Sequence, residues 1–99
     1  MRNLPEGLSQ REHQHFVAAL GVNEDITIGV LLELYSCDLE VSVADIKFNL
    51  WRGGFTTSGL TFVLFELVAA GAVVWDNDSV KLTKRGREIA ASLGNLAVT

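Results

Sequence analysis

The sequence predicts one small domain that is mainly α-helical and carries a single β-hairpin. Three observations lead to this prediction. The chain has 99 residues, which is a common size for one domain. Its hydrophobic residues make up 48% of the chain and recur mostly at helical spacing, between capping residues and glycines. Only at Asp76-Asn77-Asp78 does the pattern change to two short runs joined by a tight turn, which is typical of a hairpin.

The first helix is predicted over residues 10 to 20. Ser9 stands three residues before Glu12, which is the pattern of a capping box. In such a box the serine oxygen accepts a hydrogen bond from an unpaired backbone amide, and the glutamate side chain accepts one from the amide of the serine. Phe16 shares the buried face of the segment with Leu20. Gly21 follows directly and predicts the C-terminal end of the helix.

The next two segments also have helical spacing. Asp25 is the predicted cap of a helix over residues 26 to 36, in which apolar residues recur every three or four positions. Ser42 is the predicted cap of a shorter helix over residues 43 to 51, with Asp45 as its partner in a second capping box. These two helices complete the first half of the chain.

A glycine turn at residues 52 to 55 leads to a fourth helix. Thr56 or Thr57 is its predicted cap, because a threonine oxygen can accept a hydrogen bond from an unpaired amide of the first turn. The helix runs to Ala70. Gly71 ends it, since glycine readily adopts the left-handed backbone that commonly closes a helix.

The hairpin is predicted from two short strands, residues 72 to 75 and residues 79 to 82. Thr83 then caps a last helix, which contains Leu93 near its end, and Gly94 closes it. The predicted fold class is therefore mainly α with a small β-hairpin.

Composition and charge restrict the functions that we expect. The formal net charge is -4, whereas a DNA-binding domain is usually basic. The charge is uneven: residues 1–45 hold two basic and eight acidic side chains, and residues 46–99 hold six basic and four acidic ones. No apolar run has the length of a membrane span or of a signal peptide, so we expect no membrane partner. Cys37 is the only cysteine, which excludes an internal disulfide and fits a cytoplasmic location.

Three segments of the sequence carry a more specific pattern. They are Ser42-Val43-Ala44-Asp45-Ile46, Leu67-Val68-Ala69-Ala70-Gly71 and Leu82-Thr83-Lys84-Arg85-Gly86-Arg87-Glu88-Ile89. In this order they resemble the winged-helix superfamily, particularly the bacterial and archaeal regulators of the MarR and PadR type. The resemblance covers residues 26–93 and implies a winged helix-turn-helix with an extra N-terminal helix at residues 10–20, so that residues 1–99 form one domain. In the third segment Gly86 allows the last helix to lie close against a neighbour.

The resemblance implies a DNA-binding transcriptional regulator, dimeric in form. In that superfamily the second helix of the helix-turn-helix enters the major groove, and the hairpin, called the wing, contacts the DNA backbone or the minor groove. Here the reading helix would be residues 57 to 70 and the wing residues 72 to 82. The side chains expected on double-stranded DNA are Arg52, Thr57, Ser58, Thr61, Lys81, Lys84, Arg85 and Arg87.

The fourth helix is nevertheless a poor reader of bases. Its outward face is predicted to carry Phe62, Phe65 and Ala69, and the helix has no basic residue. Base edges are read mainly by Arg, Lys, Asn and Gln. The wing tip is acidic and would repel phosphates.

The alternative is a winged helix that contacts protein instead of DNA. Phe62, Phe65, Ala69 and Trp75 would then form the interface with a second copy or with another protein, and Trp51 could extend the same patch. Two other interpretations of the phenylalanines stay open at this point: they belong to the core, or the N-terminal helix covers them.

No residues in the sequence indicate catalysis. His13 and His15 are two positions apart and would point to different sides of a helix, which makes a poor metal pair. The glycines at positions 53, 54 and 59 are not followed by the lysine of a phosphate-binding loop. No nucleophile stands with a base and an orienting group. We therefore expect no enzyme activity, no cofactor and no metal.

Overall fold

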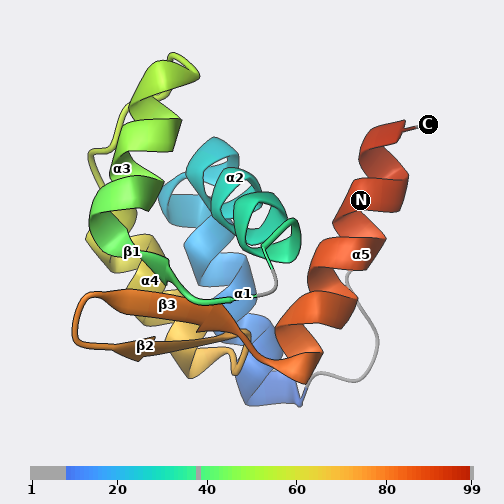
Figure 1. The fold of residues 1–99 in the computed structure, drawn as a ribbon. Coiled ribbons are helices and arrows are strands. Elements are labelled where there is room, and N and C mark those ends of the chain that lie inside the picture. The colour runs from blue at the N-terminus through green and yellow to red at the C-terminus, as the bar shows by residue number, and fades with distance from the viewer. Residues whose placement is uncertain (1–8, 38, 99) are drawn as a thin grey trace.

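The computed structural model describes residues 9–37 and 39–98, with side chains as far as residue 93 (Figure 1). In this part of the chain five helices accompany a three-stranded antiparallel sheet. The mainly α class with a small β-hairpin is thus confirmed. The elements follow in the order α1 (Gln10–Val22), α2 (Glu24–Tyr35), β1 (Val41–Ser42), α3 (Val43–Arg52), α4 (Leu60–Ala69), β2 (Val73–Asp76), β3 (Ser79–Leu82) and α5 (Lys84–Val98).

Three predicted N-terminal caps are confirmed. Ser9 and Glu12 form both bonds of the capping box: the Glu12 amide donates to the Ser9 hydroxyl at 3.2 Å, and the Ser9 amide donates to the Glu12 carboxylate at 3.0 Å. Ser42 accepts from the amide of Asp45 at 3.1 Å at the start of α3. Thr83 accepts from the amide three residues later at 2.9 Å at the start of α5. Each bond spans three residues, so the local sequence suffices to predict it.

The junction between α1 and α2 differs from the prediction. Gly21 does not end α1, and Asp25 does not cap α2. Asn23 serves both helices instead: its backbone amide donates to Ala19 of α1 at 3.2 Å, and its side chain accepts from the amide of Ile26 at 3.0 Å. The backbone of Asn23 is extended, with φ -163°, so this junction needs no left-handed glycine.

The start of α4 also differs from the prediction. The helix begins at Leu60, and neither Thr56 nor Thr57 caps it. The N-cap is Gly59, whose φ of 89° lies in the left-handed region that favours glycine. The Thr56 hydroxyl accepts from the amide of Ser58 at 3.2 Å and is therefore used in the turn before the helix.

Glycine ends α4 but not α5. Gly71 has φ 75°, and its amide donates to Val68 at 3.0 Å, as predicted for a helix end. The predicted closure of the last helix at Gly94 is wrong, because α5 continues to Val98. A glycine inside a helix costs only about 1 kcal/mol relative to alanine, which neighbouring turns can offset.

The sheet contains the predicted hairpin and one strand that was not predicted. β2 begins one residue later than expected, and Asp76 pairs with Ser79, which leaves a two-residue loop with Asn77 at φ 54°. β1 pairs with β3 through Val41 opposite Val80. The strand order is β1-β3-β2, so β3 is central and β2 lies at an edge. A two-residue strand is too short to show alternation in sequence, which explains why β1 was missed.

The core lies between paired helices above the sheet. α1 packs along α4, and α2 packs against α5 and β3 (Figure 1). The N-terminal helix therefore packs on its own domain. The only described polar side chain that is fully buried is Thr27, whose hydroxyl shares its one proton between the carbonyl oxygens of Ala19 at 2.9 Å and Asn23 at 2.8 Å. The largest apolar side chains of the core are Phe16, Ile26, Leu31, Leu34, Ile46, Leu64, Leu67 and Ile89.

Candidate functional site

One side of α4 is apolar and open to solvent. Phe62 is 67% exposed and Phe65 is 59% exposed, so neither ring belongs to the core. The opposite side of the helix is buried. We call the exposed side the α4 outer face; it consists of Thr61, Phe62, Phe65, Val68 and Ala69.

The two flanks of this face are formed by α1 and β2. On one flank His15 of α1 lies 2.6 Å from Glu66 of α4, measured from Nδ1 to the carboxylate oxygen. This contact leaves the α4 outer face itself uncovered by the N-terminal helix. On the other flank the ring of Phe65 packs on Trp75 of β2, with 5.2 Å between ring centroids. A shallow hollow at this flank is lined by Phe65, Val68, Trp75 and Asn77.

The polar residues predicted to contact DNA from the reading helix lie at its beginning. Thr57 and Ser58 precede α4, because the helix begins only at Leu60. Ser58 and Thr61 are exposed, and Thr57 is half-buried. Arg52 is the last residue of α3, and its guanidinium lies 5.9 Å from the ring centroid of Phe48. These four side chains include one basic group, and an aromatic ring already contacts it.

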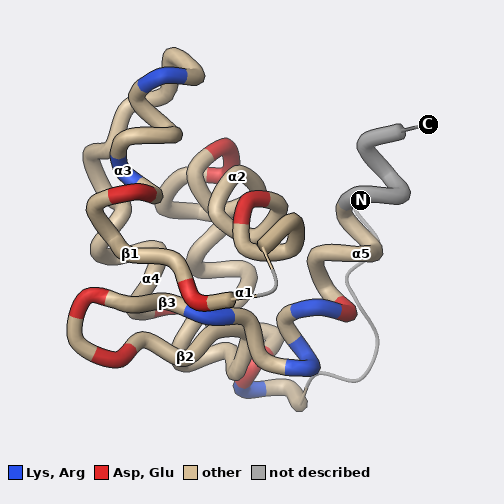
Figure 2. Tube along the Cα trace, in the orientation of Figure 1, with Lys and Arg blue, Asp and Glu red and all other residues tan. Residues whose placement is uncertain are grey.

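The other predicted DNA contacts lie on a different side of the molecule. Lys81 pairs with Val74, whereas Trp75 pairs with Val80. Because side chains alternate along a strand, Lys81 and Trp75 project from opposite faces of the sheet. Figure 2 shows the basic segments on β3 and at the start of α5, and acidic ones at the turn between β2 and β3. The predicted basic residues and the α4 outer face are therefore not brought together.

Two of these basic side chains also have partners within the chain. Arg85 forms an ion pair with Glu12 of α1. Arg87 lies 3.4 Å from the carbonyl oxygen of Cys37. Lys84 is exposed. The hydrogen bond from the Ser9 amide lowers the pKa of the Glu12 carboxyl, and Arg85 lowers that pKa further, so Glu12 stays ionised and holds Arg85.

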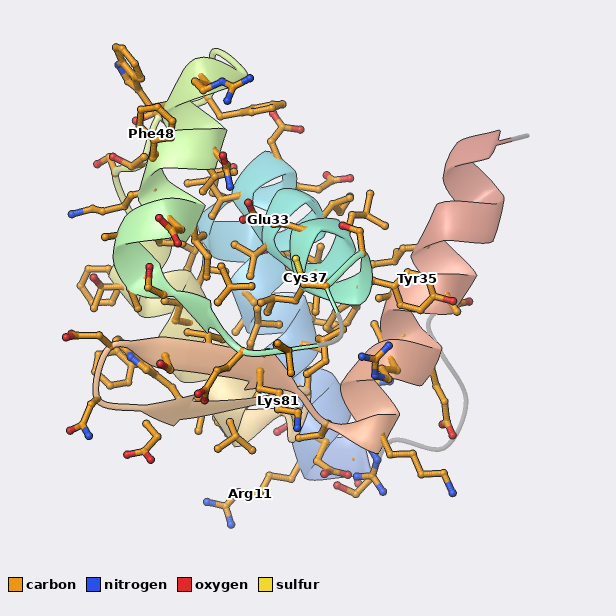
Figure 3. All side chains as sticks on the ribbon, viewed as in Figure 1. Arg11, Glu33, Tyr35, Cys37, Phe48 and Lys81 are labelled. Atoms are coloured by element: carbon orange, nitrogen blue, oxygen red, sulfur yellow. The ribbon has the colours of Figure 1, made fainter. Side chains whose placement is uncertain are left out.

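A second aromatic group lies at the C-terminal end of α3. Phe48, Trp51 and Phe55 are 53%, 69% and 44% exposed. The rings of Phe48 and Trp51 are 6.2 Å apart, and Figure 3 shows Phe48 far from Lys81 on the sheet. Trp51 thus packs with α3 residues, and the expected extension of the Phe62 patch to Trp51 is not what the contacts show. The spacing of Phe48 and Trp51, three residues apart on a helix, is the sequence signal for this group.

The remaining acidic, histidine and cysteine side chains of the described residues form no metal-binding cluster. Among them, no three His, Cys, Asp or Glu side chains are close enough to hold a metal ion. Burial raises the pKa of the Glu33 carboxyl, although a hydrogen bond from Asn49 opposes that shift. Between residues 9 and 98, position 38 aside, no helix combines the length and the apolar character of a membrane span.

Comparisons with known proteins were made on three levels. No protein family matches the chain. No curated protein sequence matches it either. No solved structure matches it. The relationship to MarR and PadR regulators therefore stays a prediction from the sequence.

Proposed function

We propose that this chain is a winged-helix domain that binds protein through the α4 outer face. The order α2-β1-α3-α4-β2-β3 consists of a helix, a short strand, two helices and a hairpin, and α5 follows the hairpin. This order supports a winged helix, with β2 and β3 as the wing and α4 in the position of the reading helix. The loop between α3 and α4, residues 53–59, is longer than the three or four residues of most helix-turn-helix units.

The observation that carries the proposal is the chemistry of the α4 outer face. Four of its five side chains are apolar, and two of them are phenylalanines exposed by more than half. Large exposed aromatics are enriched at the centres of protein interfaces, where they contribute most of the binding energy. A groove-reading helix would present donors and acceptors to base edges at these same positions.

The placement of charge supports the same conclusion. Asp76 and Asp78 are exposed at the wing tip and would repel phosphates. Lys81 projects from the sheet face opposite to Trp75, and Arg85 is paired with Glu12. Neither basic side chain lies on the α4 outer face, so neither would attract a phosphate to that face.

A photocrosslinking experiment tests the proposal. A photoreactive phenylalanine analogue replaces Phe62 in cells that express the full chain, and the matched control carries it at Tyr35, an exposed aromatic of α2. We expect adducts at position 62 that protease removes and nuclease does not, well above those at position 35. Equal yields at both positions, or adducts that nuclease removes, would contradict protein binding through this face.

DNA binding is the second candidate, because Ser58 and Thr61 are exposed at the start of α4. It predicts that a labelled duplex binds at low salt, and that the affinity falls steeply as salt rises. Replacing Lys84 and Arg85 with alanine should then weaken binding to all sequences alike. Our proposal predicts no salt-dependent change in the fluorescence anisotropy of the duplex.

A further inference from the structure

Among the described residues no strand pairs with the outer edge of β2, and this free edge lies beside the α4 outer face. We propose, resting on the function above, that a second copy of this chain covers both, in a two-fold dimer. In this dimer β2 pairs with its counterpart in antiparallel orientation, and α4 packs against its counterpart. The two sheets join into one, and each copy contributes the same surface, as a two-fold interface requires.

The backbone of β2 is ready to accept another strand. The amide of Thr83 donates to the carbonyl of Ala72 at 3.0 Å. Because bonded and non-bonded pairs alternate in an antiparallel ladder, Val74 and Asp76 also bond toward β3. The amide and carbonyl groups of Val73 and Trp75 therefore point away from the sheet.

The features that usually protect an edge strand are scarce in β2. Its pairing with β3 continues without a bulge from Val73 opposite Leu82 to Asp76 opposite Ser79. The strand contains no proline and no lysine, and its only charge is Asp76, at the tip. Val74 is 56% exposed in the middle of the strand, where a protected edge would carry a charge.

The α4 outer face adjoins the edge strand, because Phe65 packs on Trp75 of β2. α2 packs against β3, and α4 packs against β2. α4 is thus the helix next to the edge strand β2, and α2 is the helix next to the central strand β3. A strand added to β2 consequently brings its own copy of α4 alongside. Helices pack at about 8–10 Å between axes, wider than the about 4.8 Å between paired strands, so the dimer requires each copy of α4 to be set back from the shared edge, with Phe62 and Phe65 in the space between the two helices.

One register of β2 against its counterpart pairs the outward amide and carbonyl groups and keeps the two Asp76 carboxylates apart. It places Val73 of one copy opposite Trp75 of the other, which matches the outward hydrogen-bonding groups of both. Val74 then lies opposite Val74 on the two-fold axis, and Asp76 lies opposite Ala72. The two Asp76 carboxylates are about four residues apart along the strands, or roughly 14 Å, beyond the Debye length of about 8–10 Å.

The exposed apolar area suits a small dimer. With roughly 200 Å² for a phenylalanine side chain, the exposed fractions of Phe62 and Phe65 amount to roughly 250 Å². A standard interface removes about 800 Å² from each partner, of which roughly 450 Å² is apolar. The two rings supply about half of that apolar area, and Val68, Val74 and Trp75 add to it.

Sedimentation of the purified full chain tests the dimer. We expect a mass of twice 10.8 kDa that falls toward the monomer mass on dilution. Phe65→Asp and Val74→Asp should each give monomers, because the first buries a carboxylate between helices and the second sets two carboxylates face to face. Both residues are exposed in the monomer, so circular dichroism should remain unchanged. The control, Val17→Asp on α1, should remain dimeric.

A disulfide test examines the register itself. In a Cys37→Ser background, Val74→Cys should oxidise to a covalent dimer, because cross-strand pairs outside the hydrogen bonds have Cα atoms about 4.5 Å apart. Val17→Cys is the matched control and should form far less. A monomer at every concentration, or a dimer that both aspartate variants leave intact, would overturn the second copy as the occupant. Crosslinks from position 62 to a different protein would then still support the proposed function.

Discussion

Replacing Gly86 with alanine should destabilise this protein, although alanine is the better helix former. A Cβ at this position of α5 would lie 1.9 Å from the carbonyl oxygen of Ala72 and 2.9 Å from a methyl of Leu82. Ordinary van der Waals contact begins at 3.4 Å, so the start of α5 would have to move roughly 1.5 Å away from the backbone at Ala72.

This contact determines how much free energy of unfolding the alanine variant loses. Overpacking a close contact costs about 1–3 kcal/mol. The same movement strains the hydrogen bonds of Thr83: its amide donates to the Ala72 carbonyl at 3.0 Å, and its hydroxyl shares one proton between the carbonyl oxygens of Gly71 at 2.6 Å and Ala72 at 3.1 Å. These bonds contribute about 1 kcal/mol each. Alanine returns about 1 kcal/mol through helix propensity. The expected net loss in the free energy of unfolding is about 2–3 kcal/mol.

Urea unfolding followed by circular dichroism measures this loss. With a slope of about 1–2 kcal/mol per molar urea, the midpoint of Gly86→Ala should fall by roughly 1–3 M. Gly21→Ala is the matched control, because Gly21 lies inside α1 and a Cβ there meets no atom within 4 Å. It should raise stability by up to about 1 kcal/mol. Equal midpoints for the two variants would refute the close approach of α5 to Ala72.

Three further predictions concern single side chains. Asn23→Ala should lower the free energy of unfolding by about 1 kcal/mol in a urea titration, since it removes the cap of α2, whereas Asp25→Ala should change it little. Glu12→Gln should flatten the dependence of stability on pH: the pKa of Glu12 is lowered in the folded state, so its contribution is full above the ordinary glutamate pKa of about 4.3 and is lost as the pH falls through the lowered value. Thermal unfolding between neutral and acidic pH measures this, and an unchanged slope would show that Glu12 is not the group responsible. Thr27→Val should cost about 1–2 kcal/mol, because the buried Ala19 carbonyl loses a donor; an unchanged thermal midpoint would show that this hydrogen bond contributes nothing.

Much of the secondary structure could be predicted because its determinants are local. Ser9, Ser42 and Thr83 bond to amides three residues away, so each helix start is encoded within one turn. The choice of Asn23 instead of Asp25 as the cap of α2 is not decided by the local sequence. The buried hydroxyl of Thr27 shares its proton between the carbonyl oxygens of Ala19 and Asn23 and so joins the end of α1 to the start of α2. That packing is decided between helices, and a sequence pattern does not report it.

The candidate site likewise has features that the local sequence predicts and features that depend on contacts between distant residues. Helical spacing alone places Phe62, Phe65 and Ala69 on one side of α4. It does not say whether α1 lies over them. The contact of His15 with Glu66 puts α1 at the flank, and this contact joins residues 51 positions apart. The pairing of Arg85 with Glu12, across 73 positions, likewise gives a predicted phosphate contact a partner within the chain and links α5 to α1.

The sequence by itself determined the helix class, three of the helix starts, the hairpin turn and the residues that share the outward side of α4. These features depend on hydrogen bonds and spacing within a few residues. Tertiary structure alone decided that Phe62 and Phe65 face solvent, that Lys81 and Trp75 project from opposite faces of the sheet, and that β2 is an edge. The physical reason is that exposure depends on which distant elements pack against a residue, and that packing is settled by the whole core at once.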